Sequence, residues 1–416
     1  KISDMTIQRG ESTWQSGGID IWNDASVEIS KVVFRENHSR RGGAVSLTGL
    51  AEAKFIDCLF IENLAEYLND NDGWGGGQGG AVMVDIYTAD SDHLVEFIRC
   101  SFIRNRASVD GNYITGNDYA AANAGAVGVW WGRTSFVNCL FANNEARVDN
   151  GQCGTDDNGN EWCSGASGGA IAADASIWNS DKQISEGVTS RIINSTFVNN
   201  RAYGSGEEGV YVYAGAMVLW GIYDDPSGGT NSRHILFNNI IYGNSADGPN
   251  EPGDYEQNVT LHSDHRVILS DHNLIQYADQ YNGSWAGPND FEADPGFWDP
   301  MNGDFSLHRF SNSIEMGTLE FEGFTAPTDD ITGKQRPVPP ETPPDVGAYE
   351  QGAGLQITFT PEEGTVDPGA TLEVQLEAKA WDGTAIEDGS SVEWKIAPDS
   401  SYVIVESSEA VTTGGI

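Results

Sequence analysis

The chain has 416 residues with 62 acidic and 22 basic side chains, which gives a formal net charge of −40. This balance excludes the usual nucleic-acid-binding proteins, which displace counterions from phosphates with Lys and Arg, and it disfavours adhesion to an anionic bilayer. No apolar run reaches the roughly 18 residues that a membrane-spanning helix needs, and the 50 glycines indicate tight turns between short strands.

Two short patterns alternate along residues 17–244 and predict a solenoid. The first places an aromatic residue three positions before an asparagine. Its copies are Phe34–Asn37, Phe60–Asn63, Phe102–Asn105, Phe141–Asn144 and Phe197–Asn200, with Ile241–Asn244 as a weaker sixth. The second is Gly-Gly or Ala-Gly before a short apolar run, and its copies begin at Gly17, Gly42, Gly79, Ala124, Gly168 and Ala214. Apolar and polar residues alternate before each Phe, which indicates strands.

The shortest complete repeat runs from Phe34 to Phe60 and spans 26 residues, about one coil of a parallel β-helix with three short strands and three turns. We expect the Phe rings to stack in the core about 4.8 Å apart and the paired glycines to form the turns. Residues 2–10 align with residues 29–37, so the chain is expected to start inside a coil, with Ile7 in the Phe position. A helical solenoid is disfavoured because no 3.6-residue period is present.

The repeated asparagines are expected to adopt the left-handed αL conformation and to stack their amides into a ladder. The ladder residues are Asn37, Asn63, Asn105, Asn144, Asn200 and Asn244.

The ordered set of motifs resembles the repeats of the chlamydial polymorphic membrane proteins and related bacterial β-helix surface proteins. Residues 294–317, 330–337 and 345–350 resemble the closing segment of the choice-of-anchor Q family, which usually reads S-P-x-I-D-x-G. This chain has Asn312 in place of Pro and Glu315 in place of Asp. The resemblance covers about residues 1–350. It implies an all-β fold, a right-handed single-stranded parallel β-helix of the pectate-lyase-like type, and a secreted or surface location.

A domain boundary is expected near residue 350. Residues 336–344 contain five prolines, and residues 351–354 read as a linker. Residues 355–416 alternate strongly and carry turn signals, which predicts a small β-sandwich similar to bacterial Ig-like modules. This module has too few strands to be complete, so the sequence is expected to be a fragment of a longer chain.

The five cysteines fall into two groups. Cys58, Cys100 and Cys139 each precede a repeat Phe by two residues and are expected to be small buried side chains, because no His recurs with them to hold a metal. Cys153 and Cys163 flank a polar loop and are expected to form a disulfide, which suits an oxidising compartment.

Two loops carry oxygen-bearing side chains at alternate positions, which suits Ca²⁺, the one candidate cofactor. The candidate ligands are Asp70, Asp72, Asp156, Asn158 and Asn160. Neither loop matches a complete calcium-binding loop, so plain solvated turns are the alternative.

Long insertions separate the repeat asparagines from the following Gly-Gly or Ala-Gly pairs, and all of them are expected at one point of the coil. Equivalent insertions in a solenoid project from one side, which predicts a continuous wall of loops for a sugar or protein ligand. The aromatic residues of this wall are Tyr67, Trp74, Tyr113, Tyr119, Trp162, Tyr203, Tyr211 and Tyr213. These rings could instead anchor their own loops.

The sequence favours a non-catalytic extracellular protein for adhesion, surface display or fibre building. The alternatives are a carbohydrate-active enzyme, either a polysaccharide lyase or a glycoside hydrolase, and a carbohydrate-binding module. Adjacent aspartates at 156–157, 224–225 and 329–330 would point to opposite faces of a strand, so no such pair is a catalytic dyad. The expected partner is a polysaccharide, a surface protein or an identical subunit, with no nucleic acid and no membrane insertion.

Overall fold

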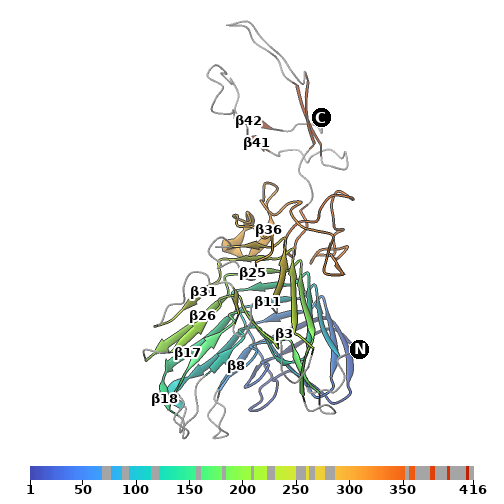
Figure 1. Ribbon diagram of the computed structural model, residues 1–416. Coiled ribbons are helices and arrows are strands. Elements are labelled where there is room, and N and C mark those ends of the chain that lie inside the picture. The colour runs from blue at the N-terminus through green and yellow to red at the C-terminus, as the bar shows by residue number, and fades with distance from the viewer. Residues whose placement is uncertain are drawn as a thin grey trace.

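The computed structural model describes residues 1–67, 76–86, 93–113, 121–155, 161–179, 184–207, 210–222, 230–249, 259–261, 268–276 and 286–351, together with four strands near the C-terminus. The described part is all-β and is built on long parallel sheets, an architecture that fits a β-solenoid (Figure 1). No helix within it is long and apolar enough to cross a membrane.

The largest sheet has 14 strands and consists of two halves joined by the long strand β3. The first half contains β1 (Ile2–Gln8), β3 (Ser26–Arg35), β6 (Glu52–Ile56), β10 (Leu94–Ile98), β15 (Arg133–Val137), β24 (Thr189–Ile193), β29 (Arg233–Phe237) and β33 (Ile268–Asp271). The second half continues from β3 through β7 (Leu59–Ile61), β11 (Ser101–Ile103), β16 (Leu140–Ala142), β25 (Thr196–Val198), β30 (Ile240–Tyr242) and β34 (Leu274–Ile275).

Three further parallel sheets complete the coils. The six-stranded sheet contains β4 (His38–Ser39), β8 (Leu64–Glu66), β12 (Arg106–Asp110), β17 (Glu145–Gly151), β26 (Arg201–Gly206) and β31 (Ser245–Asp247). The three-stranded sheet contains β13 (Ala121–Asn123), β20 (Gly165–Ser167) and β27 (Tyr211–Tyr213). The seven-stranded sheet contains β2 (Ile19–Trp22), β5 (Val45–Thr48), β9 (Val82–Asp85), β14 (Val127–Trp131), β21 (Ile171–Asp174), β28 (Met217–Trp220) and β32 (Val259–Leu261).

The remaining described elements are short. They are the antiparallel pairs β18 (Cys153–Thr155) with β19 (Glu161–Cys163), β22 (Ser176–Asn179) with β23 (Ile184–Gly187), β35 (Phe297–Asp299) with β36 (Asp304–Leu307), β37 (Glu320–Phe321) with β38 (Phe324–Thr325), β39 (Gln356–Thr360) with β40 (Gln375–Lys379), and β41 (Ser391–Glu393) with β42 (Glu409–Val411), and the 3-10 turns η1 (Gly111–Tyr113) and η5 (Pro300–Asn302). The Ig-like module and its boundaries stay predictions, because only β39–β42 are described beyond residue 351.

The core contains the predicted phenylalanine stack. Phe34, Phe60, Phe102, Phe141 and Phe197 are fully buried, and successive ring centroids lie 4.8, 4.7, 4.6 and 4.6 Å apart. A second stack, which the repeat pattern did not reveal, joins Phe55, Phe97 and Phe136 at 4.8 and 5.0 Å. The predicted register at the start of the chain is confirmed, since Ile2 pairs with Ile29 and Ile7 with Phe34.

The αL prediction for the ladder asparagines is wrong. The residue before each asparagine has the positive φ instead, as at Glu36 (53°), Glu62 (57°) and Arg104 (52°). A second αL column runs through Asp57, Arg99 and equivalent residues, between the two halves of the large sheet. The bend at Asp57 and its equivalents divides the alternating run that was expected to be one strand, residues 55–60, into β6 and β7. The later coils therefore contain more than the three strands predicted.

The paired glycines have two different roles. The first supplies a positive φ, as at Gly79 (62°), although Ala124 takes the same position at 63°. The second leaves no room for a side chain, because a Cβ on Gly80 would lie 2.0 Å from the carbonyl oxygen of Gly125 in the next coil. Close backbone approach therefore explains why every copy keeps the second glycine.

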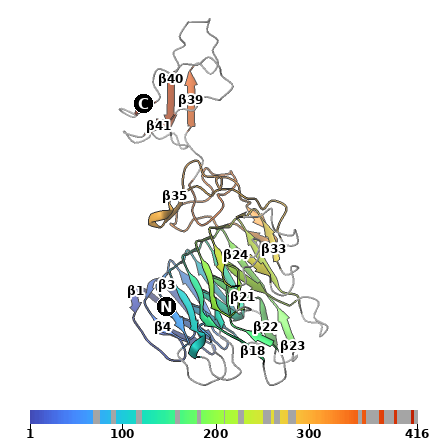
Figure 2. The ribbon, with the colours of Figure 1, turned by 90° about the vertical axis from the view of Figure 1, so that its left-hand side faces the viewer.

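The closing segment, residues 286–351, packs on the outer face of the large sheet. Figure 2 shows the coils succeeding one another from β1 to β33, with the closing segment along their side. Phe305 packs against Leu140 and Val198, and Phe321 packs against Phe237. On this face of the large sheet the outward side chains of the later coils are apolar, and the closing segment buries them.

Candidate functional site

The predicted asparagine ladder is continuous and buried. Asn37 Nδ2 donates to Asn63 Oδ1 at 2.9 Å, and the same bond joins each later pair as far as Asn244 at 2.8–3.0 Å. Each Oδ1 also accepts the backbone N–H of the preceding asparagine, as from Asn63 to Asn105 at 3.0 Å. Because the amides bond to one another and to backbone, the ladder is a structural element.

The cysteines belong to a second ladder. Cys58, Cys100 and Cys139 are buried free thiols, and the next coils place Ser195, Asn239 and Asn273 in the same column. Cys139 N–H donates to Ser195 Oγ at 3.1 Å, and Ser195 N–H donates to Asn239 Oδ1 at 2.9 Å. Burial raises the pKa of the Cys139 thiol to about 12, so it remains protonated near neutral pH and is a poor metal ligand.

The carboxylate of Asp290 ends this second ladder. Its Oδ1 accepts the backbone N–H and the Nδ2 of Asn273, at 2.8 and 2.9 Å, as a further asparagine would. Ser270 Oγ also donates to Asp290 Oδ2. Burial raises the pKa of Asp290.

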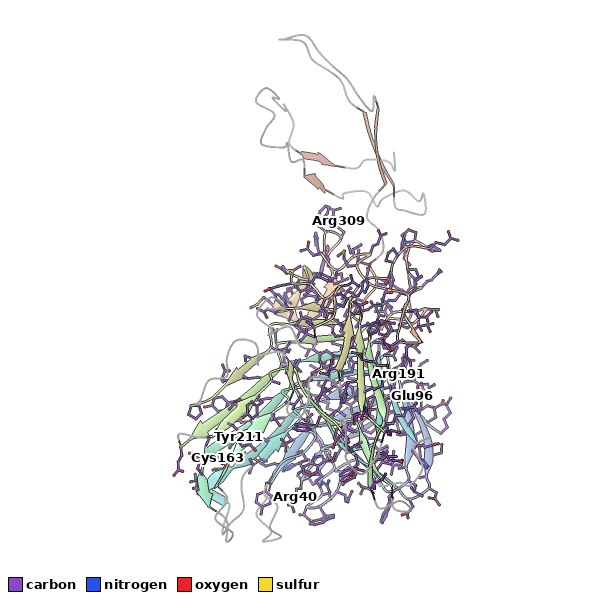
Figure 3. The ribbon with its side chains drawn as sticks, in the orientation of Figure 1. Arg40, Glu96, Cys163, Arg191, Tyr211 and Arg309 are labelled. Carbon is purple, nitrogen blue, oxygen red and sulfur yellow. A yellow bond between two sulfur atoms is a disulfide. The ribbon has the colours of Figure 1, made fainter. Side chains whose placement is uncertain are left out.

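The predicted disulfide between Cys153 and Cys163 is present and links β18 to β19. Figure 3 shows Cys163 near Tyr211, on the opposite side of the solenoid from Glu96 and Arg191. The proposed calcium ligands Asp70, Asp72, Asp156, Asn158 and Asn160 lie outside the described residues. No group of three or more His, Cys, Asp or Glu within the described ranges could hold a metal ion.

The long insertions that follow the repeat asparagines leave from neighbouring strands of the six-stranded sheet, at the ends of β8, β12, β17 and β26. One further insertion, which the sequence analysis did not include, lies at a different point of the coil. The β22–β23 hairpin is inserted between the seven-stranded and large sheets, where Ala175, Ile177 and Val188 form a small core of their own.

The predicted aromatic residues are only partly brought together. Tyr67 is buried beneath Arg40 at 5.0 Å, and the Tyr211 and Tyr213 rings stack at 5.3 Å. Tyr203 lies within 4.6 Å of the guanidinium of Arg147. Trp74 and Tyr119 fall outside the described residues, as do the side chains of Tyr113 and Trp162.

A groove of about 690 Å³ crosses the Asn-ladder turn where the six-stranded sheet begins. Its lining comes from equivalent positions of four coils, at residues 62–64, 104–106 and 143–145 and at Asn199 and Arg201. Glu62 pairs with Arg104 at 2.8 Å, and Glu145 lies 3.7 Å from Arg201. The lining arginines outnumber the lining carboxylates in a chain of net charge −40.

The outer face of the seven-stranded sheet carries a set of residues that the sequence analysis missed. The tryptophan–aspartate row comprises Trp22, Thr48, Asp85 and Trp131, which pair in register, followed by Asp174 and Trp220 on the next two strands. The register of β14 shifts between Val129 and Trp131, so Trp131 is not paired with Asp174. In register, Asp85 pairs with Trp131 and Asp174 pairs with Trp220. A signal was available, because most of these residues follow the alanine of the Gly-Gly-Ala or Ala-Gly-Ala motif by four positions.

Strand alternation points this row away from the core. Ile171 and Ala173 of β21 belong to the core cluster, so Asp174 faces outward. Burial raises the pKa of Asp174 to about 6, a shift that a hydrogen bond with Ser176 opposes.

The two aspartates of the row have different surroundings. Asp85 Oδ2 accepts a hydrogen bond from Arg41 at 2.8 Å. Asp174 Oδ1 is buried and finds no hydrogen-bond partner in the described part of the chain. His234 Nε2 donates to the carbonyl oxygen of Trp220 at 2.7 Å, and burial lowers its pKa to about 4.

Comparison with protein-family models, with curated proteins and with solved structures finds no match for this chain.

Proposed function

We propose that the chain is a right-handed parallel β-helix followed by an Ig-like module, and that it is a non-catalytic extracellular or cell-surface protein for adhesion, surface display or fibre building. Crossovers between parallel strands are right-handed in about 98% of cases, which supports the handedness. The Cys153–Cys163 disulfide supports an oxidising location.

The groove beside the six-stranded sheet is the observation that carries this proposal. The groove spans four coils, whose turns are joined by the buried asparagine ladder. Its shape is therefore preorganised for binding. Glu62 and Glu145 each have arginine neighbours within 4 Å, at Arg104 and Arg201. General acid–base catalysis needs a carboxyl group that faces the substrate, whereas these carboxylates face arginines. The groove therefore suits the binding of a polar polymer better than catalysis.

The proposed partner of this groove is a surface polysaccharide. The test measures retention of the protein on cell-wall polysaccharide and compares Arg104→Gln and Arg201→Gln with the control Lys31→Gln, an exposed cation at the other bend. Both groove variants are expected to lose about tenfold in affinity, since a charge-assisted hydrogen bond contributes about 1.5–3 kcal/mol. Equal binding by all three variants would refute the assignment.

Fibre building by identical subunits is the competing role. Electron microscopy with and without a chelator distinguishes it, because calcium-dependent filaments are expected only if subunits associate through the acidic loops.

A second candidate, polysaccharide hydrolysis, is favoured by the raised pKa of Asp174, about 6. Asp85 lies two strands away, which corresponds to about 9.6 Å along the sheet, just above the roughly 6.5–9.5 Å that separates the carboxyl groups of inverting glycosidases. Release of reducing ends that disappears in Asp174→Asn would support hydrolysis. No release from a polysaccharide that binds would exclude it.

A further inference from the structure

We propose that the groove beside the six-stranded sheet binds an acidic polysaccharide and holds one carboxylate of this ligand between Arg104 and Arg106. The inference rests on the proposed function, because it concerns the same groove. It adds the charge of the ligand and the coil at which that charge is recognised. The lining comes from successive coils, so a bound polymer would extend along the solenoid axis.

The two walls of the groove are columns of equivalent residues on either side of the buried asparagine ladder. One wall is the αL column, which contains Arg104, Asn143 and Asn199 in successive coils. The other wall consists of the first residues of the strands in the six-stranded sheet, such as Arg106 of β12. Arg104 and Arg106 flank the buried Asn105, whose amide is bonded to its neighbours in the ladder. The two guanidinium groups therefore line opposite walls at one coil.

Arg106 differs from the other two arginines of the lining. Arg104 and Arg201 pair with glutamates, whereas no ion pair within 4 Å involves the exposed Arg106 in the described part of the chain. Arg104 donates to Glu62 through Nε and Nη2, and its Nη1 has no hydrogen-bond partner among the described residues. A guanidinium group presents five N–H donors in a planar fork that matches the two oxygens of a carboxylate. The two arginines thus have donors for one acidic group of a ligand.

The αL wall continues with two amides that suit the hydroxyl groups of a sugar. Asn143 and Asn199 are exposed, and neither side-chain amide makes a hydrogen bond within the part of the chain that the structure describes. Each amide offers donors and an acceptor, as a hydroxyl group does. Neighbouring strands lie about 4.8 Å apart, so these amides follow Arg104 at steps of about 4.8 Å along the axis. This order fits a hydroxyl-rich polymer that carries carboxylates.

The local charge of the groove favours an anionic ligand although the whole chain is acidic. The lining contains three arginines and two glutamates, in a chain of net charge −40. At physiological ionic strength the Debye length is about 8 Å, so exposed charges farther from the groove are largely screened. A neutral polysaccharide would leave the guanidinium group of Arg106 without a charged partner.

The test is calorimetric titration of the full chain with hexamers of mannuronate and of hyaluronan, each compared with its carboxyl-reduced form. Carboxyl reduction removes the charge and keeps the linkages. At least one acidic hexamer is expected to bind about tenfold or more tightly than its reduced form. Arg106→Gln should abolish most of this preference, and Arg106→Lys should retain part of it. Asn143→Gly, which preserves the αL bend, should weaken both forms by several-fold.

The matched control is Arg133→Gln, which removes a cation from β15 of the large sheet, outside the groove, and should leave both affinities unchanged. The inference would be overturned by absence of binding of every acidic hexamer, or by an equal loss in the control. Tighter binding of glycerol phosphate hexamers, added as the phosphate probe, would also refute the carboxylate assignment.

Failure of this inference can be told apart from failure of the proposed function. If acidic and reduced hexamers bind equally and Arg104→Gln weakens both, the groove binds polysaccharide without selecting charge. That result would leave the proposed function standing and refute the acidic ligand. If no hexamer and no cell-wall polysaccharide binds, both the inference and the polysaccharide assignment of the groove are wrong.

Discussion

At the residue scale, two adjacent residues have different roles at each turn of the asparagine ladder. The exposed αL residue, such as Asn143, makes the bend. The buried asparagine that follows, Asn144, satisfies backbone groups at the same bend of the preceding coil, the Asn105 N–H and the Phe102 carbonyl. Separating these roles lets the αL position vary between Glu, Arg, Asn and Gly, whereas the ladder position needs both a donor and an acceptor.

Replacing a ladder residue should be costly. Asn144→Ala removes the acceptor of the Asn105 N–H and Nδ2 and the donor to the Phe102 carbonyl. Each buried group left unpaired costs about 1–3 kcal/mol, so the free energy of unfolding should fall by at least about 3 kcal/mol in urea titrations. The control Asn143→Gly, at an αL position, should change it by less than about 0.5 kcal/mol.

The phenylalanine stack should be equally sensitive. Phe102 is fully buried between Phe60 and Phe141, so Phe102→Ala should lower the free energy of unfolding by about 3–5 kcal/mol. Ile103→Ala, at a half-buried outward position, should cost less than half as much. A loss under about 1 kcal/mol for Phe102→Ala would contradict a packed stack.

His234 should make stability depend on pH. Its pKa falls from 6.5 to about 4 because burial disfavours the imidazolium. The contribution of up to about 3 kcal/mol is present above pH 6.5 and is lost as pH falls toward 4. Asp174, with a pKa raised to about 6, has the opposite effect, because protonation of its buried carboxyl group adds stability as the pH falls below 6. The stability difference between wild type and His234→Gln isolates the histidine, and a flat difference from pH 7 to 4.5 would contradict this prediction.

At the element scale, the closing segment is held by buried charge as well as by its apolar contacts. The Arg336 side chain is fully buried with Glu350, at 3.0 Å. Asp330 and Asp345 accept backbone N–H bonds from within the segment, as from Gln351 at 2.7 Å to Asp345. These carboxylates lie in residues 330–337 and 345–350, two of the three stretches that resemble a family closing segment. Their contacts give these two stretches a structural explanation.

Breaking the ion pair should detach the segment before the coils unfold. Arg336→Met leaves the Glu350 carboxyl group buried without its cation and should cost about 3–5 kcal/mol. Burial already raises the pKa of Glu350 to about 7, so the loss should be larger at pH 8 than at pH 5. Hydrogen exchange should accelerate across residues 286–351 first. Lys334→Met, at an exposed position of the same motif, should leave exchange unchanged.

At the scale of the whole molecule, successive coils are joined chiefly by ladders, stacks and strand pairing between neighbours. Each coil therefore contacts mainly the coils beside it, while the closing segment spans several, from Arg99 to Asn238. The described strands β39–β42 pair within themselves and not with the parallel sheets. This separation favours independent unfolding of the residues beyond 351.

Ending the chain after Gln351 should leave the solenoid intact. The shortened chain should keep the thermal midpoint of the main transition of the full chain to within about 2 °C, because the described contacts of residues 286–351 are with the solenoid. A shift of 10 °C or more would show that the C-terminal strands stabilise the coils and that the predicted boundary is wrong.

The sequence by itself determined the coil. The spacing of Phe34, Phe60 and Phe102 and the asparagine three positions after each fixed the register of the parallel strands, because a β-helix repeats its geometry whenever its sequence repeats. The Cys153–Cys163 pairing was also readable, since both residues flank one short loop.

Only the tertiary structure decided which residues meet across coils of unequal length. Successive ladder asparagines are separated by 26, 42, 39, 56 and 44 residues, so the number of residues between Asp85 and Trp220 does not by itself show that they lie on one sheet face, although each follows its motif alanine by four positions. The αL bends fall one residue before the asparagines, because a buried amide must face the next coil while its exposed neighbour takes the strained turn. Whether a side chain points into the core or outward depends on the sheet that carries it. Only the tertiary structure therefore showed which residues are structural and which are candidates for ligand binding.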